Sequence, residues 1–133
     1  MKTCPACGYD KMIFEARDIP FDYKHEHLVV AKVKGWFCQS CNEALFADGE
    51  GVRYAAELDS FVADVDKRQI EELRRIRKKL HLTQKEAARL FGGGVNAFSE
   101  YERGVTKPAK STLLLFKVLD KHPDLVDEIR LYG

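Results

Sequence analysis

A chain of 133 residues, 45% hydrophobic and 32% charged, has the composition of a folded protein and is long enough for one ordinary domain or two small ones. No apolar run approaches the roughly 20 residues of a membrane-spanning helix, and Lys2-Thr3-Cys4-Pro5 is not the start of a secretory signal peptide. The sequence therefore predicts a cytoplasmic protein, in which paired cysteines hold metal more often than they form disulfides.

The net charge of +1 conceals two parts of opposite charge. Residues 1–66 carry 7 Lys and Arg against 12 Asp and Glu, a net charge of −5, whereas residues 67–133 carry 15 against 9, a net charge of +6. The basic part suits a polyanion such as DNA, whose phosphates supply most of the non-specific attraction. The acidic part is either a surface for a basic partner or an ordinary solvated surface.

All four cysteines lie in the acidic part, in two C-x2-C pairs that are 30 residues apart. The pairs are Cys4 with Cys7 and Cys38 with Cys41. Each C-x2-C turn directs two thiolates toward one centre, and two such turns complete a tetrahedral zinc shell. Because four protein ligands leave no position for water, we predict one structural zinc ion.

Two alternatives to this zinc site come from the same region. Cys-Pro-Ala-Cys alone would fit a thioredoxin-like redox pair, but the second pair would then be unexplained and no helical pattern follows Cys7. His25 and His27 could replace a cysteine ligand, although their alternate positions on a strand are more simply those of surface residues.

Three extended runs are predicted between the cysteine pairs, at residues 11–16, 19–24 and 28–37. A sheet this small buries too little surface to be stable alone, so zinc would supply much of its folding free energy. The second run would be an edge strand whose Phe21, Tyr23 and Lys24 offer aromatic anchors and a cation to a protein partner. The alternative for Phe21 is a place in the core of the sheet.

A helical period begins at Asp48. Its inward stripe is Val52, Ala55, Leu58, Phe61, Val62 and Val65, and a second stripe follows as Ile70, Leu73, Ile76 and Leu80. The five-residue step from Val65 to Ile70 breaks the phase where the charge changes sign, so we place the boundary between domains 1–66 and 67–133 there, as a short hinge or a kinked helix. The basic run at residues 74–79 is interpreted mainly as the solvated face of a helix, with some side chains near phosphate.

Residues 82–108 have the pattern of a DNA-reading helix-turn-helix. Thr83-Gln84-Lys85-Glu86 fits a capping box, in which the threonine hydroxyl and the glutamate carboxylate each bond a backbone N–H of the first turn. This pattern predicts a helix that begins at Gln84, with Ala87, Leu90 and Phe91 on its buried face.

Gly92-Gly93-Gly94 ends that helix, because glycine adopts left-handed backbone angles at little cost. A second helix is predicted over residues 95–103, with Val95, Phe98 and either Tyr101 or Glu102 inward. Its polar stripe can meet base edges in a major groove. The predicted DNA-contacting residues are Thr83, Gln84, Lys85, Asn96, Ser99, Glu100, Arg103 and Lys107.

Two more helices are predicted after the helix-turn-helix, from Ser111 to His122 and from Asp124 to Leu131. With the helix at residues 70–80, the basic part then has five helices, the number and order of a phage-repressor-type, Xre-like domain. The fold class is therefore α+β: a small zinc-bound β domain with a helix, followed by an all-α five-helix domain. Surplus apolar residues in the last helices are expected to pack a dimer, since two copies read two half-sites.

Several motifs together resemble the MqsA-type antitoxins, a YgiT-like zinc finger joined to an Xre-like helix-turn-helix. They are the CPxCG pair, the second CxxC after Trp36-Phe37, the segment RKKLHLTQKEAARLFGGGVNAFSEYERG and the closing LDKHPDLVDEIR. The resemblance implies an antitoxin of a type II toxin-antitoxin system. Its zinc domain would bind a small basic ribonuclease toxin, and its helical domain, as a homodimer, would bind a palindromic operator and repress its own operon.

By position, the resemblance implies that the four cysteines are zinc ligands, that Asn96 is the leading base reader, and that Tyr23 and Lys24 face the toxin. Glu100 departs from the family pattern, in which an arginine that reads guanine is expected. A glutamate can accept from cytosine N4, which implies a different operator, or it pairs with Arg103 at i+3.

Two other classes of function compete with the antitoxin. An enzyme is disfavoured, because no nucleophile has a base at a suggestive spacing and the glycine triplet lacks the lysine and hydroxyl of a P-loop. A stand-alone zinc- or redox-responsive transcriptional regulator stays open, because it needs the same metal site and the same DNA-binding helices.

Overall fold

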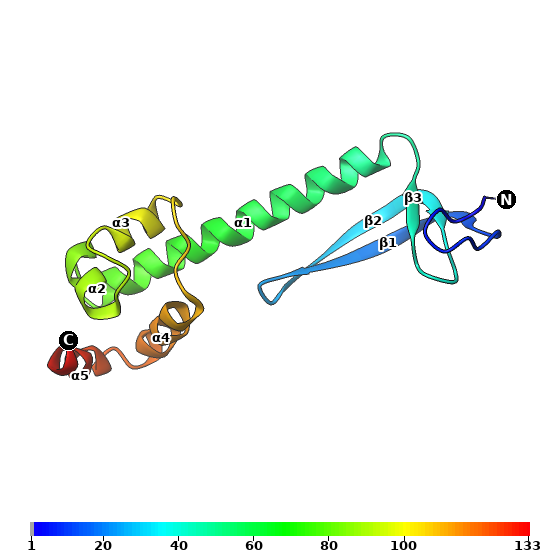
Figure 1. Cartoon of the computed structure of the whole chain (residues 1–133). Coiled ribbons are helices and arrows are strands. Elements are labelled where there is room, and N and C mark those ends of the chain that lie inside the picture. The colour runs from blue at the N-terminus through cyan, green and yellow to red at the C-terminus, as the bar shows by residue number, and fades with distance from the viewer. Residues whose placement is uncertain (1) are drawn as a thin grey trace. The chain divides into compact units, whose positions relative to one another are not determined.

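The computed structural model describes residues 2–133 as a three-stranded sheet followed by five helices (Figure 1). The strands are β1 (Ile13–Tyr23), β2 (Glu26–Phe37) and β3 (Ala44–Phe46), and the helices are α1 (Glu50–Lys79), α2 (Gln84–Phe91), α3 (Ala97–Glu102), α4 (Lys110–Lys121) and α5 (Leu125–Tyr132). Two compact units are present, one ending at Val65 and the other beginning at Asp66. Within the described residues, no helix is both long and apolar enough to cross a bilayer.

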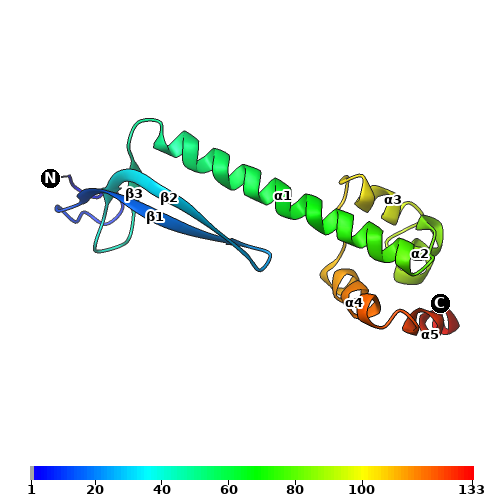
Figure 2. The ribbon, with the colours of Figure 1, turned by 180° about the vertical axis from the view of Figure 1, so that it is seen from behind.

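The sheet is antiparallel, with strand order β1-β2-β3, and both ribbon views show β1 and β2 as a long hairpin (Figures 1 and 2). The prediction of two strands separated near Asp18 and Pro20 is wrong, because β1 runs unbroken through both residues. The register shifts between Arg17 and Ile19, where β2 contains one extra residue opposite Asp18. Strand β1 is also an edge strand, where proline is tolerated. The three-residue strand β3 was too short to be predicted.

Cys4, Met12 and Cys38 form a small buried cluster in the first unit, packed by Tyr9, Trp36 and Leu45. The first half of α1 meets the sheet through two ring contacts, Phe21 with Phe61 at 6.2 Å and Phe46 with Tyr54 at 5.2 Å between centroids. The predicted inward stripe of this helix is only partly correct, because Val52 is 77% exposed and Ala55 is also exposed.

Helix α1 continues without interruption across the boundary between the two units, so a non-helical hinge at residues 64–68 is excluded. The segment contains neither glycine nor proline, and charged residues with good helix propensity keep the backbone helical while the apolar stripe changes face. The helix ends at Lys79, and the turn that follows contains His81, whose φ of 58° is left-handed and whose N–H bonds to the carbonyl of Lys78. The two helical segments predicted on either side of residues 64–68 are thus one helix, and six predicted segments correspond to five helices.

The core of the second unit is built from the C-terminal part of α1 and from α2 to α5. Its aromatic centre is Phe98, which stacks on Phe116 at 5.5 Å, while Phe91 meets the Phe116 ring edge-on at 4.9 Å. Val95 was predicted to be inward but is 71% exposed, because α3 begins only at Ala97, after the glycine turn. Of the two alternatives for the last inward position, Glu102 is buried and Tyr101 is half-buried.

Glu102 is a buried carboxylate that joins α1 to α3. Arg77 binds it through two nitrogens, Nε to Oε2 at 2.8 Å and Nη2 to Oε1 at 2.9 Å, and Arg74 Nε donates to Oε1 at 3.1 Å. Arg77 Nη1 also donates to the Leu82 carbonyl at 2.7 Å, just before α2. One network therefore holds α1, the start of α2 and the end of α3.

The basic run on α1 is largely exposed, as the sequence indicated, because Arg75, Lys78 and Lys79 are at exposed positions. Most of its side chains nevertheless also bind other helices. Besides Arg74 and Arg77, Arg75 binds both carboxylate oxygens of Asp120 on α4, at 3.1 and 2.9 Å. Lys79 Nζ donates to the same side chain at 3.0 Å. Hydrogen bonds from Arg75 and Lys79 hold the pKa of Asp120 well below its usual range. Four of the five basic side chains therefore bind other helices within the unit.

Replacing Glu102 by Gln should destabilise the second unit by about 3–5 kcal/mol, because Arg77 would remain buried without a carboxylate. Burial raises the pKa of Glu102, but the bonds from Arg77 and Arg74 outweigh it and lower the pKa below its ordinary value. The stabilisation is thus complete above the unfolded-state pKa of about 4.3 and is lost as pH falls toward the folded-state value. Urea unfolding of the parent and of Glu102→Gln at several pH values measures this. The exposed Glu128→Gln is the control, and equal stability of the three proteins at pH 7 would contradict the assignment.

Candidate metal centre and helix-turn-helix

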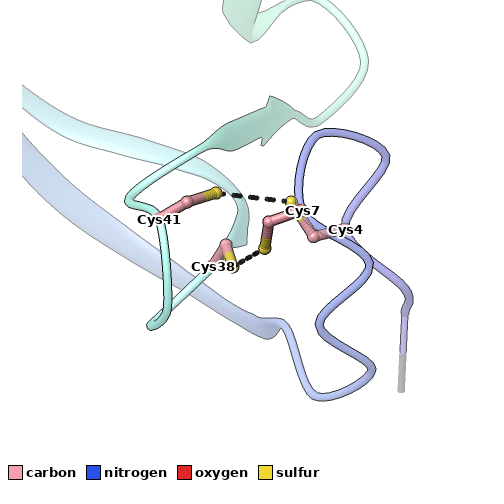
Figure 3. Close-up of side chains that lie close together, drawn as sticks. All are labelled: Cys4, Cys7, Cys38 and Cys41. Atoms are coloured by element: carbon pink, nitrogen blue, oxygen red, sulfur yellow. Dashed lines mark hydrogen bonds between the residues drawn. The ribbon is translucent and has the colours of Figure 1, made fainter.

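The four cysteines meet at one end of the sheet, where their Sγ atoms all lie within 4.8 Å of one another (Figure 3). The distances are 3.6 Å between Cys4 and Cys41 and 3.6 Å between Cys7 and Cys38. Four sulfurs at 2.3 Å from a tetrahedral zinc ion would be about 3.8 Å apart, so these spacings fit such an ion. Within residues 2–133, this is the one group of three or more potential ligands placed to hold a metal.

Each cysteine pair is shaped by a tight turn that ends in a left-handed residue. Gly8 has a φ of 81° and Asn42 a φ of 64°, and each directly follows the second cysteine of its pair. The Gly8 N–H bonds to the Cys4 carbonyl at 2.9 Å, and the Asn42 N–H bonds to the Cys38 carbonyl at 3.0 Å. These equivalent bonds bring the thiols of both turns to the same centre.

The thiols differ in exposure and in acidity. Cys4 and Cys38 are buried, while Cys7 and Cys41 are exposed. Burial opposes ionisation of Cys38, but hydrogen bonds from the backbone N–H groups of Cys41 and Ser40 lower its pKa to about 7. His25 and His27 do not join the cluster, and His27 Nδ1 lies 2.6 Å from the Asp22 carboxylate instead. The arrangement supports a closed site of four sulfur ligands without histidine.

Helix α2 begins as predicted, because the Thr83 hydroxyl accepts a hydrogen bond from the Glu86 N–H at 3.0 Å. The other half of the capping box, a bond from the Thr83 N–H to the Glu86 carboxylate, is not formed within residues 2–133. The Glu86 carboxylate instead accepts a bond from Arg130 of α5 at 2.8 Å, so it serves a longer-range contact.

The glycine triplet turns the chain from α2 toward α3 through three left-handed residues, with φ values of 85°, 94° and 96°. A Cβ atom on Gly93 would lie 2.7 Å from the Tyr101 hydroxyl and 3.0 Å from Ala97 Cβ, so a side chain there has no room. This turn therefore requires glycine both for its backbone angles and for close packing.

The structure places the eight predicted DNA-contacting residues on three neighbouring segments. Asn96 is exposed at the N-cap of α3, and within residues 2–133 its side chain makes no capping hydrogen bond. Gln84 is half-buried and contributes a hydrogen bond that lowers the pKa of Glu102. The remaining members are Thr83 and Lys85 at the start of α2, Ser99 and Glu100 on α3, Arg103 at its C-cap and Lys107 in the following loop.

The sequence offered an ion pair between Glu100 and Arg103 as an alternative role for Glu100. In the structure, Arg103 Nε donates to the Ser99 carbonyl at 3.3 Å. Glu100 is half-buried on α3, and its own N–H bonds to the carbonyl of Asn96 at 3.0 Å. Asn96 and Arg103 are the two caps of α3, and Glu100 lies between them on the same helix.

The three residues predicted to contact a toxin lie near the tip of the β1–β2 hairpin. Phe21 is half-buried and its ring contacts Phe61. This packing favours the alternative for Phe21, a place in the core, over a toxin contact. Tyr23 ends β1, and Lys24 Nζ lies 5.2 Å from the centroid of the Tyr23 ring. The aromatic ring and the cation are therefore presented together at the turn.

The sequence did not reveal that Arg74, Arg77 and Glu102 hold the helix-turn-helix together. A signal was present, since the two arginines are three residues apart on a helix and Glu102 was one of two candidates for an inward position. The identity of the partner could not be read from spacing alone, because the contact spans 25 residues from Arg77.

Comparison with known proteins finds a matching family, a similar curated sequence and a similar solved structure. The sequence model of a family described as the antitoxin component of bacterial toxin-antitoxin systems, MqsA, matches residues 1–130. Antitoxin MqsA of Escherichia coli (strain K12) is 42% identical over 129 residues, which cover 96% of this chain and 98% of that protein. A solved structure of the N-terminal domain of E. coli MqsA, 26% identical, covers 48% of this chain and 96% of its own, with a TM-score of 0.44. On the strength of the two sequence matches, the chain belongs to the MqsA antitoxin family, whose members act in toxin-antitoxin systems and are not enzymes.

Proposed function

We propose that this antitoxin has two binding functions, one in each compact unit. Its first unit binds and neutralises a small basic ribonuclease toxin, and its second unit represses the antitoxin's own operon by binding a palindromic operator. The observation that carries the proposal is the separation of the two candidate sites. The cysteine cluster and the hairpin belong to the acidic unit, whereas the helix-turn-helix belongs to the basic unit.

A zinc ion held by Cys4, Cys7, Cys38 and Cys41 would be structural. Four sulfur ligands fill a tetrahedral shell, so no position is left for water or substrate. The ion would join the two cysteine turns at the end of a small sheet, and two of its ligands, Cys4 and Cys38, belong to the buried cluster there. It would thereby stabilise the base of the hairpin that carries the proposed toxin contacts.

The proposed operator contact centres on Asn96. A carboxamide at the N-terminal end of a recognition helix can form two hydrogen bonds to adenine in the major groove, and this side chain is exposed. Glu100 stands on the same short helix and can accept from cytosine N4, so we propose that it adapts this protein to its own operator sequence. The exposed lysines at positions 85 and 107 would contact phosphates.

We propose a homodimer formed through the C-terminal helices, because a palindrome needs two recognition helices. The last two helices expose several apolar side chains that one copy leaves uncovered. They are Leu114, Leu115 and Val118 on α4, with Leu125, Leu131 and Tyr132 on α5.

Freshly purified protein should contain about one zinc ion per chain, and Cys38→Ser should lose most of it, because Cys38 is a buried member of the cluster. Metal analysis by plasma mass spectrometry measures the content. The control is Ser40→Ala, a change at an exposed position between the two ligands of the same turn. An equal zinc content in parent and Cys38→Ser would contradict the assignment.

Asn96→Ala should weaken operator binding by about 5- to 160-fold, since each lost bidentate base contact is worth about 1–3 kcal/mol. Its thermal stability should be unchanged, because the side chain is exposed. Fluorescence anisotropy with operator and with scrambled DNA separates the loss of specific binding from phosphate attraction. The control is Ser60→Ala on an exposed part of α1, and an unchanged footprint for Asn96→Ala would show that α3 does not read the operator.

A further inference from the structure

The β1–β2 hairpin contains a bulge near its middle. The register passes from Arg17 paired with Val33 to Ile19 paired with Val30, so β1 advances by two residues while β2 advances by three. Two residues of β2, Ala31 and Lys32, therefore lie opposite the single residue Asp18 of β1. Lys32 has a left-handed φ of 52°. A bulge of this kind bends the strand, increases its twist and removes backbone groups from the ladder.

Side chains from two other segments satisfy the freed backbone groups. The Lys32 N–H bonds to the Asp18 carboxylate at 2.9 Å. On the helix side, Arg53 Nη2 donates to both the Ala31 and the Lys32 carbonyls, each at 3.1 Å. The bulge is thus held by three hydrogen bonds, two of them to Lys32, the non-glycine residue at positive φ, which indicates a feature that the fold maintains.

Arg53 is itself fixed by two glutamates on α1. Its Nε donates to Glu50 at 2.7 Å and its Nη1 to Glu57 at 3.2 Å, so every nitrogen of the guanidinium has an acceptor. The other Glu50 oxygen accepts from the Lys34 N–H at 3.4 Å, next to the bulge. These pairs raise the pKa of Arg53, with the Glu50 hydrogen bond as the main cause. The planar fork is therefore charged and held in one orientation.

Beyond the bulge, residues 19–30 form an arm whose turn is Lys24–His25, with φ values of 49° and 66°. Five residues separate Asp18 from Tyr23, a length of about 17 Å in an extended strand. A rotation of roughly 10° at the bulge would therefore displace the tip by about 3 Å. The direction of the arm within the first unit is set at this bulge and at the Phe21–Phe61 contact.

We propose that Arg53 is a positioning residue for toxin binding, which acts through the Ala31 and Lys32 carbonyls to aim Tyr23 and Lys24 at the toxin. This inference rests on the proposed toxin-binding function of the hairpin. Lysine in place of Arg53 would keep the charge but lose the fork, and one ammonium group cannot replace four directed hydrogen bonds.

The test measures the affinity of the full-length, zinc-loaded chain for the purified small basic protein encoded beside it in the operon. Arg53→Lys should bind at least tenfold more weakly, with unchanged zinc content and operator affinity. Asp18→Ala, a milder change at an exposed residue, should show a smaller loss. Arg89→Lys, the same chemical change at an exposed position of α2, is the matched control and should bind like the parent.

A double-mutant cycle with Tyr23→Ala distinguishes positioning from general stability. If Arg53 acts through the tip, adding Arg53→Lys to Tyr23→Ala should cost less than a further twofold. Fully multiplicative losses, or parental affinity for Arg53→Lys, would overturn the inference while leaving toxin binding intact. If the parent chain itself does not bind the probe, the proposed function fails together with the inference.

Discussion

The helix-turn-helix depends on one buried carboxylate. Glu102 stands at the end of α3 with its side chain 2% exposed, and it is held by both Arg74 and Arg77 of α1. Arg77 also donates to the Leu82 carbonyl, and Arg74 donates to the carbonyl of Glu102 itself. Because backbone as well as side-chain atoms are bound, the network fixes the path of the chain at both ends of α2–α3. A short helix of six residues can then present Asn96 in a defined direction.

The first unit also has to hold its backbone in a defined path, and its buried cluster is smaller than that of the second unit. Four thiols join two distant turns, and Arg53 joins α1 to the bulged hairpin. In both units an arginine on α1 donates to carbonyl oxygens where the neighbouring backbone departs from regular structure. Charged side chains therefore complete the fold where hydrophobic packing is limited, and they do so beside the segments that we propose to bind toxin and operator.

Much of this architecture could be predicted from local sequence patterns. The cysteine spacing predicted the four-thiol cluster, Thr83 predicted the start of α2, and the glycine triplet predicted the turn. The errors arose where tertiary structure overrides a local signal. Proline on an edge strand did not break β1, and a phase change without a helix breaker did not end α1. The Arg77–Glu102 and Arg53–bulge contacts join residues 21 to 25 positions apart, beyond what periodicity can reveal.

The central claim is that one chain uses separate units for two partners. Hydrogen–deuterium exchange on the zinc-loaded chain tests it most directly, with the proposed small basic toxin and the proposed operator DNA added separately. We expect the basic protein to slow exchange in residues 19–30 and the DNA to slow exchange in residues 83–107. Protection of residues 83–107 by the basic protein with none in the hairpin, or protection of the hairpin by operator DNA, would contradict the account.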